Sequence, residues 1–171
     1  MSMDNIILKL FAYESPIGKL TIAEQEGKLR GIWLTGELKL MPETEITIIK
    51  EETPLIAETH RQLEEYFAGE RREFDLPLFP QGTDFQQRVW QELCDIPYGC
   101  TVSYGEIAKR IGCPGGARAV GMANNRNPWL IVLPCHRVIG ADGSMVGYGS
   151  GIDKKIFLLE LEKKNFVQKL Q

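Results

Sequence analysis

The chain has only two histidines, and one of them directly follows a cysteine in the stretch LPCHRVIG, residues 133–140. A cysteine beside a histidine is a candidate nucleophile with its base, because the thiolate is the reactive form and a free thiol has a pKa of about 8.5. Apolar surroundings raise the pKa of a thiol further, and Cys135 follows the apolar run WLIVLP. His136 is therefore the group that can oppose this effect and keep Cys135 reactive.

Pairing of Cys135 with His136 requires a particular backbone. Neighbours in an extended segment point to opposite faces, so the two side chains need a sharp turn or a bridging water. Pro134 and the glycine-containing loop beyond favour such a turn. A base also needs an orienting partner, for which Glu160 and Glu162 are candidates in the last helix. On residue type alone, a structural core cysteine and a hydrogen-bonded histidine remain the more common interpretations.

The segments before the motif must position it. The run WLIVL, residues 129–133, is predicted to be a buried strand that leads into the motif. Thr83 with Gln86, and Ser103 with Glu106, are capping-box patterns that each predict the start of a helix. A further helix is expected over ARAVGMANN after the turn CPGG, and a last one from about residue 153 to residue 164, with Phe157, Leu158 and Leu161 apolar.

Two short helices joined by a glycine-rich turn are typical of a helix-turn-helix. The second of them, ARAVGMANN, places small residues around Arg118. Small side chains allow tight packing on the protein's own core, and they equally allow close approach to a nucleic-acid backbone with Arg118 reaching further in. Composition alone does not decide between these two interpretations. The small residues are Ala117, Ala119, Gly121 and Ala123.

Residues 1–80 are predicted to form a small α/β domain with an antiparallel sheet and one helix. His60 lies among charged residues of that helix and is expected to be a solvated surface residue. The segment REFDLPLFPQG, residues 72–82, is predicted to be a linker, so that the second domain comprises residues 81–171. The strand patterns cover residues 6–13, 19–25, 28–34 and 46–49, and the helix runs from Thr53-Pro54 to about Phe67 with Ile56, Leu63 and Phe67 inward.

Charge and cysteine content restrict the classes of protein to which the chain can belong. The 171 residues have a net charge of −3; residues 1–81 carry 9 Lys+Arg and 15 Asp+Glu, whereas residues 82–171 carry 11 and 8. The back half is therefore the part expected to meet a polyanion. No targeting or membrane-spanning segment is visible, so we expect a cytoplasmic protein. The four cysteines fit no zinc-ligand spacing and are predicted to be free thiols: Cys94, Cys100, Cys113 and Cys135.

The motif Pro134-Cys135-His136-Arg137-Val138 resembles the active-site motif of the O6-alkylguanine-DNA alkyltransferases, the methylated-DNA–protein-cysteine methyltransferases. The resemblance covers about residues 83–164, while residues 1–80 match in size and pattern only. It implies an α+β fold in which a small α/β domain precedes a winged helix-turn-helix-like, mostly helical domain. The other matching segments are Phe85 with Val89-Trp90, Pro97-Tyr98-Gly99, Ser103–Ala108, Ala117–Gly121, Asn127-Pro128 and Val146-Gly147-Tyr148.

The resemblance implies a DNA repair reaction without turnover. A cysteine takes the methyl or other alkyl group from O6 of guanine, and we expect the same for O4 of thymine. Cys135 would be the nucleophile, His136 would act as base through a water, and Glu162 would orient the imidazole. Tyr104 would donate a proton toward a ring nitrogen of the departing guanine. Such a reaction needs no cofactor, and the chain contains no cofactor motif.

The implied partner is double-stranded DNA, bound through its minor groove by a monomer that needs no other protein. Arg118 would enter the base stack and fill the gap left by the flipped nucleotide. Asn127 would brace the turn beside the active site. The other residues expected to contact DNA are Ser103, Ala117, Ala119, Gly121 and Asn125; those expected to line the base pocket with Asn127 are Pro134, Val138, Tyr148, Gly149 and Ser150.

Two features of the sequence differ from those of some relatives. Some relatives hold a structural zinc in the first domain, where this chain has no cysteine and only His60, so no zinc or other metal is predicted. Ser150 stands where many relatives have glycine. The larger side chain predicts a pocket narrowed toward methyl over bulky adducts.

Three other functions are open to the sequence. A non-catalytic relative would bind alkylated DNA but would lack the cysteine at position 135. A transcription regulator would use the helix-turn-helix and leave Cys135, His136 and Tyr148 idle. A Cys–His hydrolase would use a histidine distant in sequence, and only His60 is distant. Transfer of one labelled methyl group to each protein molecule would separate the repair function from all three.

Overall fold

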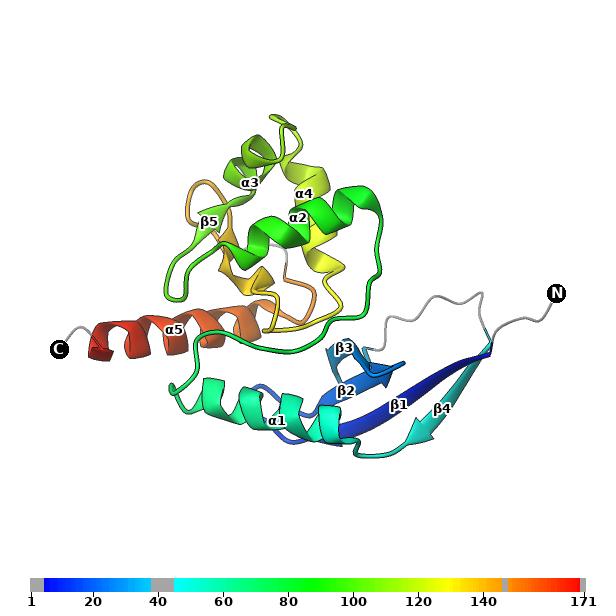
Figure 1. The fold of residues 1–171 in the computed structure, drawn as a ribbon. Coiled ribbons are helices and arrows are strands. Elements are labelled where there is room, and N and C mark those ends of the chain that lie inside the picture. Colours follow the sequence, from blue (N-terminus) through cyan, green and yellow to red (C-terminus); the bar gives the residue numbers. More distant parts are fainter. Residues whose placement is uncertain (1–4, 38–44, 146–147, 170–171) are drawn as a thin grey trace. The chain divides into compact units, whose positions relative to one another are not determined.

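The computed structural model describes residues 5–37, 45–145 and 148–169. The chain forms two compact units, residues 1–80 and 81–171. The first contains strands β1 to β4 and helix α1, and the second contains helices α2 to α5, strands β5 and β6 and the 3₁₀ turn η1 (Figure 1). Val146 and Gly147 of the predicted substrate loop lie outside the described residues. Within the described ranges, no helix combines the length and the apolar character needed to cross a bilayer.

The first unit contains a four-stranded sheet of order β3-β2-β1-β4. Glu26 and Gly27 join β2 to β3, and their φ angles of 52° and 77° are both positive, as a type I′ turn requires. β2 is antiparallel to both of its neighbours, β1 and β3, as predicted. β4 runs parallel to β1, so the sheet is mixed rather than antiparallel throughout. The strands are β1 (Ile6–Tyr13), β2 (Leu20–Gln25), β3 (Lys28–Leu34) and β4 (Ile46–Lys50).

Helix α1 (Pro54–Phe67) covers one face of this sheet (Figure 1). The Thr53 hydroxyl caps it by accepting a hydrogen bond from the Ile56 N–H at 3.1 Å. Ile56 and Leu63 are buried as predicted, whereas Tyr66 is buried in the place expected for Phe67, which is half-buried. The pattern therefore predicted the helix and its start correctly and its last core residue one position too late.

His60 is half-buried rather than fully solvated. Its ring stacks on Tyr13 with the ring centroids 3.7 Å apart, and its Nε2 lies 3.0 Å from the Glu64 carboxylate. Both partners belong to the first unit, so these contacts contribute to the packing of α1 on the sheet.

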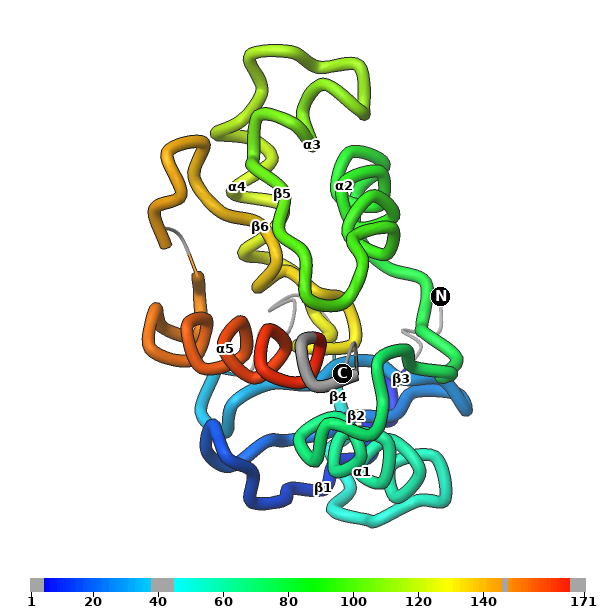
Figure 2. The backbone as a smooth tube through the Cα atoms, turned by 90° about the vertical axis from the view of Figure 1, so that its left-hand side faces the viewer, coloured from blue at the N-terminus to red at the C-terminus, as the bar shows by residue number. Residues whose placement is uncertain are grey.

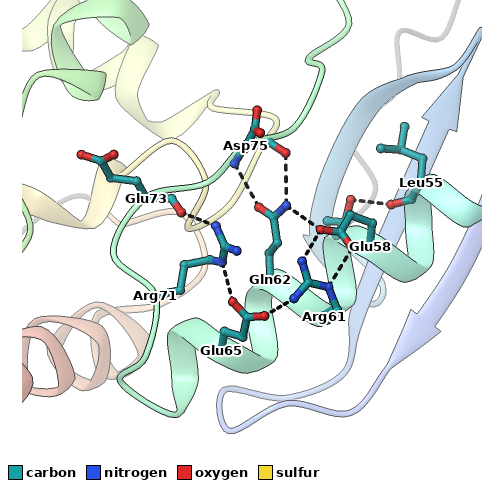
Figure 3. A network of polar contacts seen from close by, with 9 residues as sticks. Leu55, Glu58, Arg61, Gln62, Glu65, Arg71, Glu73 and Asp75 are labelled. Atoms are coloured by element: carbon teal, nitrogen blue, oxygen red, sulfur yellow. Dashed lines mark hydrogen bonds and ion pairs between the residues drawn. The ribbon is translucent and has the colours of Figure 1, made fainter.

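A polar network ties the chain that leaves α1 back to that helix (Figure 3). The buried Gln62 side chain donates to the carbonyl oxygen of Asp75 at 3.1 Å and accepts from the Asp75 N–H at 3.0 Å. Glu65 pairs with Arg61 and, at 2.9 Å, with Arg71. Residues 71–75 are therefore held against the helix.

The predicted linker is hydrogen-bonded over most of its length. The backbone of Leu29 donates to the Pro77 carbonyl at 2.7 Å and accepts from the Phe79 N–H at 2.9 Å, so this segment pairs with β3. On the other side of Pro80, the Gln87 side chain lies 3.2 Å from the carbonyl oxygens of Gln81 and Gly82. The sequence predicted a linker here, and its composition does not reveal these backbone partners.

The second unit is mostly helical, and its first three helices pack together beside the short β5–β6 pair (Figure 2). Its core contains Val89 and Leu93 of the first helix, with Ile107 and Val120 from the next two helices. The elements are α2 (Asp84–Cys94), β5 (Val102–Ser103), α3 (Tyr104–Arg110), α4 (Ala117–Asn125), η1 (Cys135–Arg137), β6 (Val138–Ile139) and α5 (Ile152–Lys169).

One of the two predicted capping boxes forms completely, and the other forms only in part. Thr83 accepts from the Gln86 N–H at 3.1 Å, and its own N–H donates to the Gln86 side chain at 3.0 Å, which completes a capping box. Ser103 accepts from the Glu106 N–H at 3.1 Å, but the Glu106 carboxylate lies 3.4 Å from Arg110 instead of returning to the cap.

The turn between α3 and α4 depends on glycine. Gly112 and Gly115 have φ angles of 74° and 93°, a conformation that other residues rarely adopt. The order helix, turn, helix is that of a helix-turn-helix, and the wing stays a prediction.

Candidate functional site

The apolar run before the motif is not the predicted strand. Residues 129–133 form a tight buried turn in which the Val132 N–H donates to the Leu130 carbonyl at 2.8 Å. Ile131 has a φ of 71°, an unusual conformation for a β-branched residue. A short apolar run does not distinguish a strand from a buried turn, and here the surrounding contacts hold the turn.

Asn127 provides those contacts. Its side-chain nitrogen donates to the carbonyl oxygens of Leu133 at 2.8 Å and Trp129 at 3.3 Å, and its oxygen accepts from the Trp129 N–H at 2.9 Å. The side chain is 8% exposed, so these bonds form away from water. Asn127 thus fixes the backbone that leads to Cys135.

Cys135, His136 and Arg137 form a single 3₁₀ turn, η1. The Arg137 N–H closes it by donating to the Pro134 carbonyl at 3.0 Å. This is the sharp bend that a neighbouring thiol and imidazole require. Cys135 is 4% exposed and His136 is fully buried.

The tautomer of His136 follows from its partner. Its Nε2 lies 2.9 Å from Oε1 of Glu162, and a carboxylate oxygen only accepts, so Nε2 carries the proton. Nδ1 then presents its lone pair, and it has no hydrogen-bond partner among the residues that the structure describes. The imidazole is therefore oriented as a base with Nδ1 as the accepting atom.

Burial and charge set the ionisation of this pair. Burial lowers the pKa of His136, and the positive charges of Arg137 and Lys155 act in the same direction against the pull of Glu162. Burial alone would raise the pKa of Glu162, but its hydrogen bonds to His136 and Arg137 outweigh that effect and bring it to about 2. At neutral pH the site therefore contains a neutral imidazole beside a carboxylate.

Arg137 is the counter-charge of Glu162. Its Nε lies 2.9 Å from Oε1 and 3.1 Å from Oε2, and its Nη2 lies 2.6 Å from Oε1. Nη1 donates to the Ile96 carbonyl at 2.7 Å, which anchors the guanidinium to the end of α2. Because all these groups are buried, the carboxylate is held in a single position for His136.

Tyr104 and Lys155 form a second pair of polar side chains near Cys135. Lys155 is fully buried, donates to the Val138 carbonyl, and places its Nζ 3.4 Å from the Tyr104 hydroxyl. Nζ also lies 5.6 Å and 6.0 Å from the ring centroids of Tyr104 and Tyr148. Burial lowers the pKa of Lys155, whereas the negative charge of Cys135 raises it. An ammonium at this position therefore stabilises a negative charge on Sγ.

Tyr104 is suited to donate a proton. Burial raises its pKa, the charge of Cys135 raises it further, and a hydrogen bond from Asn124 acts in the opposite direction. Its hydroxyl therefore carries a proton at neutral pH.

Helix α4 has an inner and an outer side. Val120 and Ala123 are buried, and the Trp90 indole donates to the Ala123 carbonyl at 2.9 Å, so this side packs on the core. Arg118 and Ala119 are exposed. The packing interpretation of the small residues therefore holds for the buried side of the helix, and close approach of the exposed side to a nucleic-acid backbone stays a prediction.

The remaining predicted site residues differ in their burial. Pro134, Val138 and Tyr148 are buried, Gly149 is exposed, and Ser150 is half-buried. Ala117, Gly121 and Asn125 on α4 are half-buried, as is Ser103 at the start of α3. The catalytic candidates are thus brought together around Cys135, whereas Arg118 and Ala119 face away from the core.

Sequence reasoning missed three residues of the site: Asn124, Arg137 and Lys155. Among the described side chains of α5, Lys155, Leu158 and Glu162 are fully buried and are spaced three and four residues apart, whereas Phe157 is 38% exposed. With Glu162 assigned inward, this helical spacing could have identified Lys155 as a second inward residue. Of the three apolar residues noted in the sequence of this helix, Leu158 is buried, Leu161 is half-buried and Phe157 is exposed.

Comparisons with known proteins identify relatives of both units. The family model described as "6-O-methylguanine DNA methyltransferase, ribonuclease-like domain" matches residues 9–80. The model described as "6-O-methylguanine DNA methyltransferase, DNA binding domain" matches residues 84–164.

Two whole-chain relatives carry the name methylated-DNA–protein-cysteine methyltransferase. The protein of Methanosarcina acetivorans is 51% identical over 152 residues, which are 88% of this chain and 95% of the relative. That of Mycobacterium leprae is 49% identical over 157 residues, 92% and 93% of the two chains. Among solved structures, Mycobacterium tuberculosis OGT in complex with DNA matches with a TM-score of 0.80 and 48% identity over 92% of this chain and 94% of that one.

Proposed function

The chain belongs to the 6-O-methylguanine DNA methyltransferase family, and we propose that it repairs DNA by moving the alkyl group of O6-alkylguanine onto Cys135. The first unit, residues 1–80, serves as the small N-terminal domain. The second unit, residues 81–171, both binds DNA and carries out the transfer, because every residue of the candidate site lies in it.

His136 removes the thiol proton. Its Nδ1 is the accepting atom, and a water between Sγ and Nδ1 carries the proton from one side chain to the next. The imidazolium that forms is stabilised by the Glu162 carboxylate 2.9 Å away. Lys155 adds a positive charge beside the sulfur, and these two effects oppose the cost of a buried thiolate.

The thiolate then displaces guanine from the alkyl carbon. The Sγ–C bond forms with an electron pair from sulfur, the C–O6 bond breaks, and its electron pair remains on the purine. Tyr104 donates its hydroxyl proton to a ring nitrogen of the departing base, and the Lys155 ammonium 3.4 Å away stabilises the resulting oxyanion. The product is a thioether, which has no acidic proton, and the thiolate that would have to depart from it is a poor leaving group. Each protein molecule therefore reacts once.

The outer side of α4 is the DNA-binding surface in this proposal. A base inside a duplex cannot reach a buried thiol, so the damaged nucleotide must leave the stack. Arg118 enters the gap from the minor groove, and the small exposed side chain of Ala119 allows the helix to approach closely. The neighbouring DNA contacts are assigned to Ser103, Ala117, Gly121 and Asn125.

The flipped base occupies a pocket next to Cys135. Pro134, Val138 and Tyr148 form its buried wall, and Asn127 holds the backbone of that wall in place. Gly149 and Ser150 close it from the loop before α5. The action on O4-methylthymine, the monomeric state and the cytoplasmic location stay predictions.

The observation that carries the proposal is the buried series Cys135, His136 and Glu162, with the basic nitrogen of the imidazole unpaired within the described structure. Its test is a duplex with one labelled O6-methylguanine, incubated with excess protein. We expect one label on each reacting protein molecule, no transfer by Cys135→Ala, and normal transfer by Cys113→Ala, whose thiol is exposed. Binding without transfer by the unsubstituted protein would refute the repair function.

A further inference from the structure

The segment Pro97-Tyr98-Gly99 has no role in the reaction described above. It belongs to the turn after α2, which the Cys100 N–H closes by donating to the Pro97 carbonyl at 3.1 Å. A Cβ at Gly99 would lie only 2.9 Å from the Cβ of Phe166 on α5. The turn is therefore packed closely on the helix that carries Glu162.

The ring of Tyr98 lies against the guanidinium of Arg137. Cζ of Arg137 is over the ring, 5.6 Å from its centroid, and the two residues are 7% and 6% exposed. A guanidinium is planar and carries its N–H donors at its edge, so that its faces are suited to stack on an aromatic ring. Tyr98 therefore contributes a cation–π interaction away from bulk water, where such an interaction is strongest.

Oxygen acceptors occupy the edge of the same guanidinium. Nε and Nη2 of Arg137 contact the Glu162 carboxylate, and Nη1 donates to the carbonyl oxygen of Ile96, two residues before Tyr98, at 2.7 Å. The Ile96 carbonyl restrains the guanidinium within its plane, and the Tyr98 ring restrains it from tilting out of that plane. The turn after α2 thus holds Arg137 in two directions.

The position of Arg137 affects His136 because both residues use the same oxygen of Glu162. Oε1 lies 2.9 Å from Nε2 of His136, 2.9 Å from Nε of Arg137 and 2.6 Å from its Nη2. The negative face of an aromatic ring balances part of the charge of a cation that lies over it. The Tyr98 ring therefore leaves more of the negative charge on Oε1 to the imidazole, and it keeps the guanidinium aligned with the carboxylate.

We propose that Tyr98 is a positioning residue for the transfer reaction, whose ring holds the Arg137 guanidinium and thereby fixes Glu162 as the partner of His136. The inference rests on the proposed function and deepens it, because Tyr98 acts through Arg137 and Glu162 rather than on the substrate. The aromatic face carries this role. The hydroxyl of Tyr98, which lies 3.4 Å from Nδ2 of Asn165, is not needed for it.

The test compares Tyr98→Leu, which removes the aromatic face, with Tyr98→Phe, which keeps the face and removes the hydroxyl. The chain has two histidines, so the imidazole resonances of protein with isotope-labelled histidine report on His136, with His60 of the first unit as internal reference. At neutral pH we expect Tyr98→Leu to move the Nε2 and Nδ1 resonances of His136 and to leave those of His60 in place. Tyr98→Phe should move neither set.

The single-turnover transfer rate, measured at protein concentrations that saturate the duplex, gives the consequence for the reaction. We expect Tyr98→Leu to lose about tenfold, because an imidazole with a displaced carboxylate partner is a weaker base, and Tyr98→Phe to stay within about twofold. Affinity for undamaged duplex should not change. Tyr98→Met also lacks the aromatic face and carries the same comparison where the leucine variant does not fold.

Val89→Ala is the control for a loss of packing alone. Val89 is fully buried earlier on α2, so its truncation should lower the stability of the unit. The His136 resonances should stay in place, and the transfer rate of the folded protein should remain within about twofold.

Unmoved His136 resonances or an unchanged transfer rate in Tyr98→Leu would overturn the role of Tyr98. Equal changes in Tyr98→Phe would do the same, because the aromatic face is then not the cause. Absence of transfer by the unsubstituted protein is a different result: it would overturn the proposed function, while the resonances still decide whether the ring holds Glu162 against His136.

Discussion

The replacement Glu162→Gln removes one buried charge while it keeps the shape of the side chain. Glu162 is fully buried, faces His136 at 2.9 Å, and receives three close contacts from Arg137. The amide retains one acceptor oxygen but has no charge to match the guanidinium. Arg137 is 6% exposed and is left without its counter-ion in a place that water barely reaches.

The size of the effect follows from the pKa of Glu162. A carboxyl group whose pKa falls from 4.5 to about 2 on folding contributes about 3 kcal/mol at neutral pH, because one pKa unit corresponds to about 1.4 kcal/mol. Removal of one partner of a buried ion pair usually costs about 3–5 kcal/mol, which agrees with this value. A lowered folded-state pKa means that the contribution is complete above the unfolded value and is lost as the pH falls toward 2.

Urea unfolding of the whole chain at several pH values measures this contribution. We expect Glu162→Gln to be less stable than the unsubstituted protein by about 3 kcal/mol at pH 7, and the difference to shrink below about pH 4.5 and nearly vanish at about pH 2. Glu160→Gln is the control, because Glu160 is exposed on the same helix and should change stability by less than about 0.5 kcal/mol. A difference that stays constant across this pH range would refute the assignment of the stabilisation to the charge of Glu162.

Three further outcomes follow from the site. Arg118→Ala should slow transfer from duplex DNA about tenfold or more while affinity for undamaged duplex changes little, since it removes the side chain that fills the gap; unchanged transfer would remove this role. Tyr104→Phe should slow transfer by a factor of about 100, and because burial and the charge of Cys135 raise the pKa of Tyr104, the rate of the unsubstituted protein should not decline through tyrosine ionisation between about pH 7 and 9.5. Ser150→Gly should raise the ratio of benzyl to methyl transfer relative to the unsubstituted protein, and a constant ratio would contradict a pocket narrowed by the serine.

Local signals predicted the parts of the fold that depend on local contacts. The capping box of Thr83 and Gln86, and the turn at Glu26 and Gly27, each involve residues at most three positions apart. The direction of β4 was not available from its sequence, because ITII has the same pattern whether its neighbour is parallel or antiparallel.

The sequence predicted the nucleophile of the site but missed two of the charged residues around it. A buried charge is stable only through partners, and those of Arg137 and Lys155 lie far away in the sequence: Glu162 is 25 residues from Arg137, and Tyr104 is 51 from Lys155. Single-residue preferences place Arg and Lys on the surface. A pattern search therefore assigns such residues to solvent until the fold brings their partners together.

On either side of Pro80, hydrogen bonds hold the chain against its own unit. The chain is bound to Leu29 through Phe79 and to Gln87 from Gln81 onward. A protease that needs an extended, accessible stretch finds none of useful length here, so limited digestion of the folded protein should not release separate halves. An engineered flexible spacer belongs between Pro80 and Gln81, where it would interrupt neither set of bonds; its own end-to-end distance would be about 5–6 Å times the square root of its number of residues.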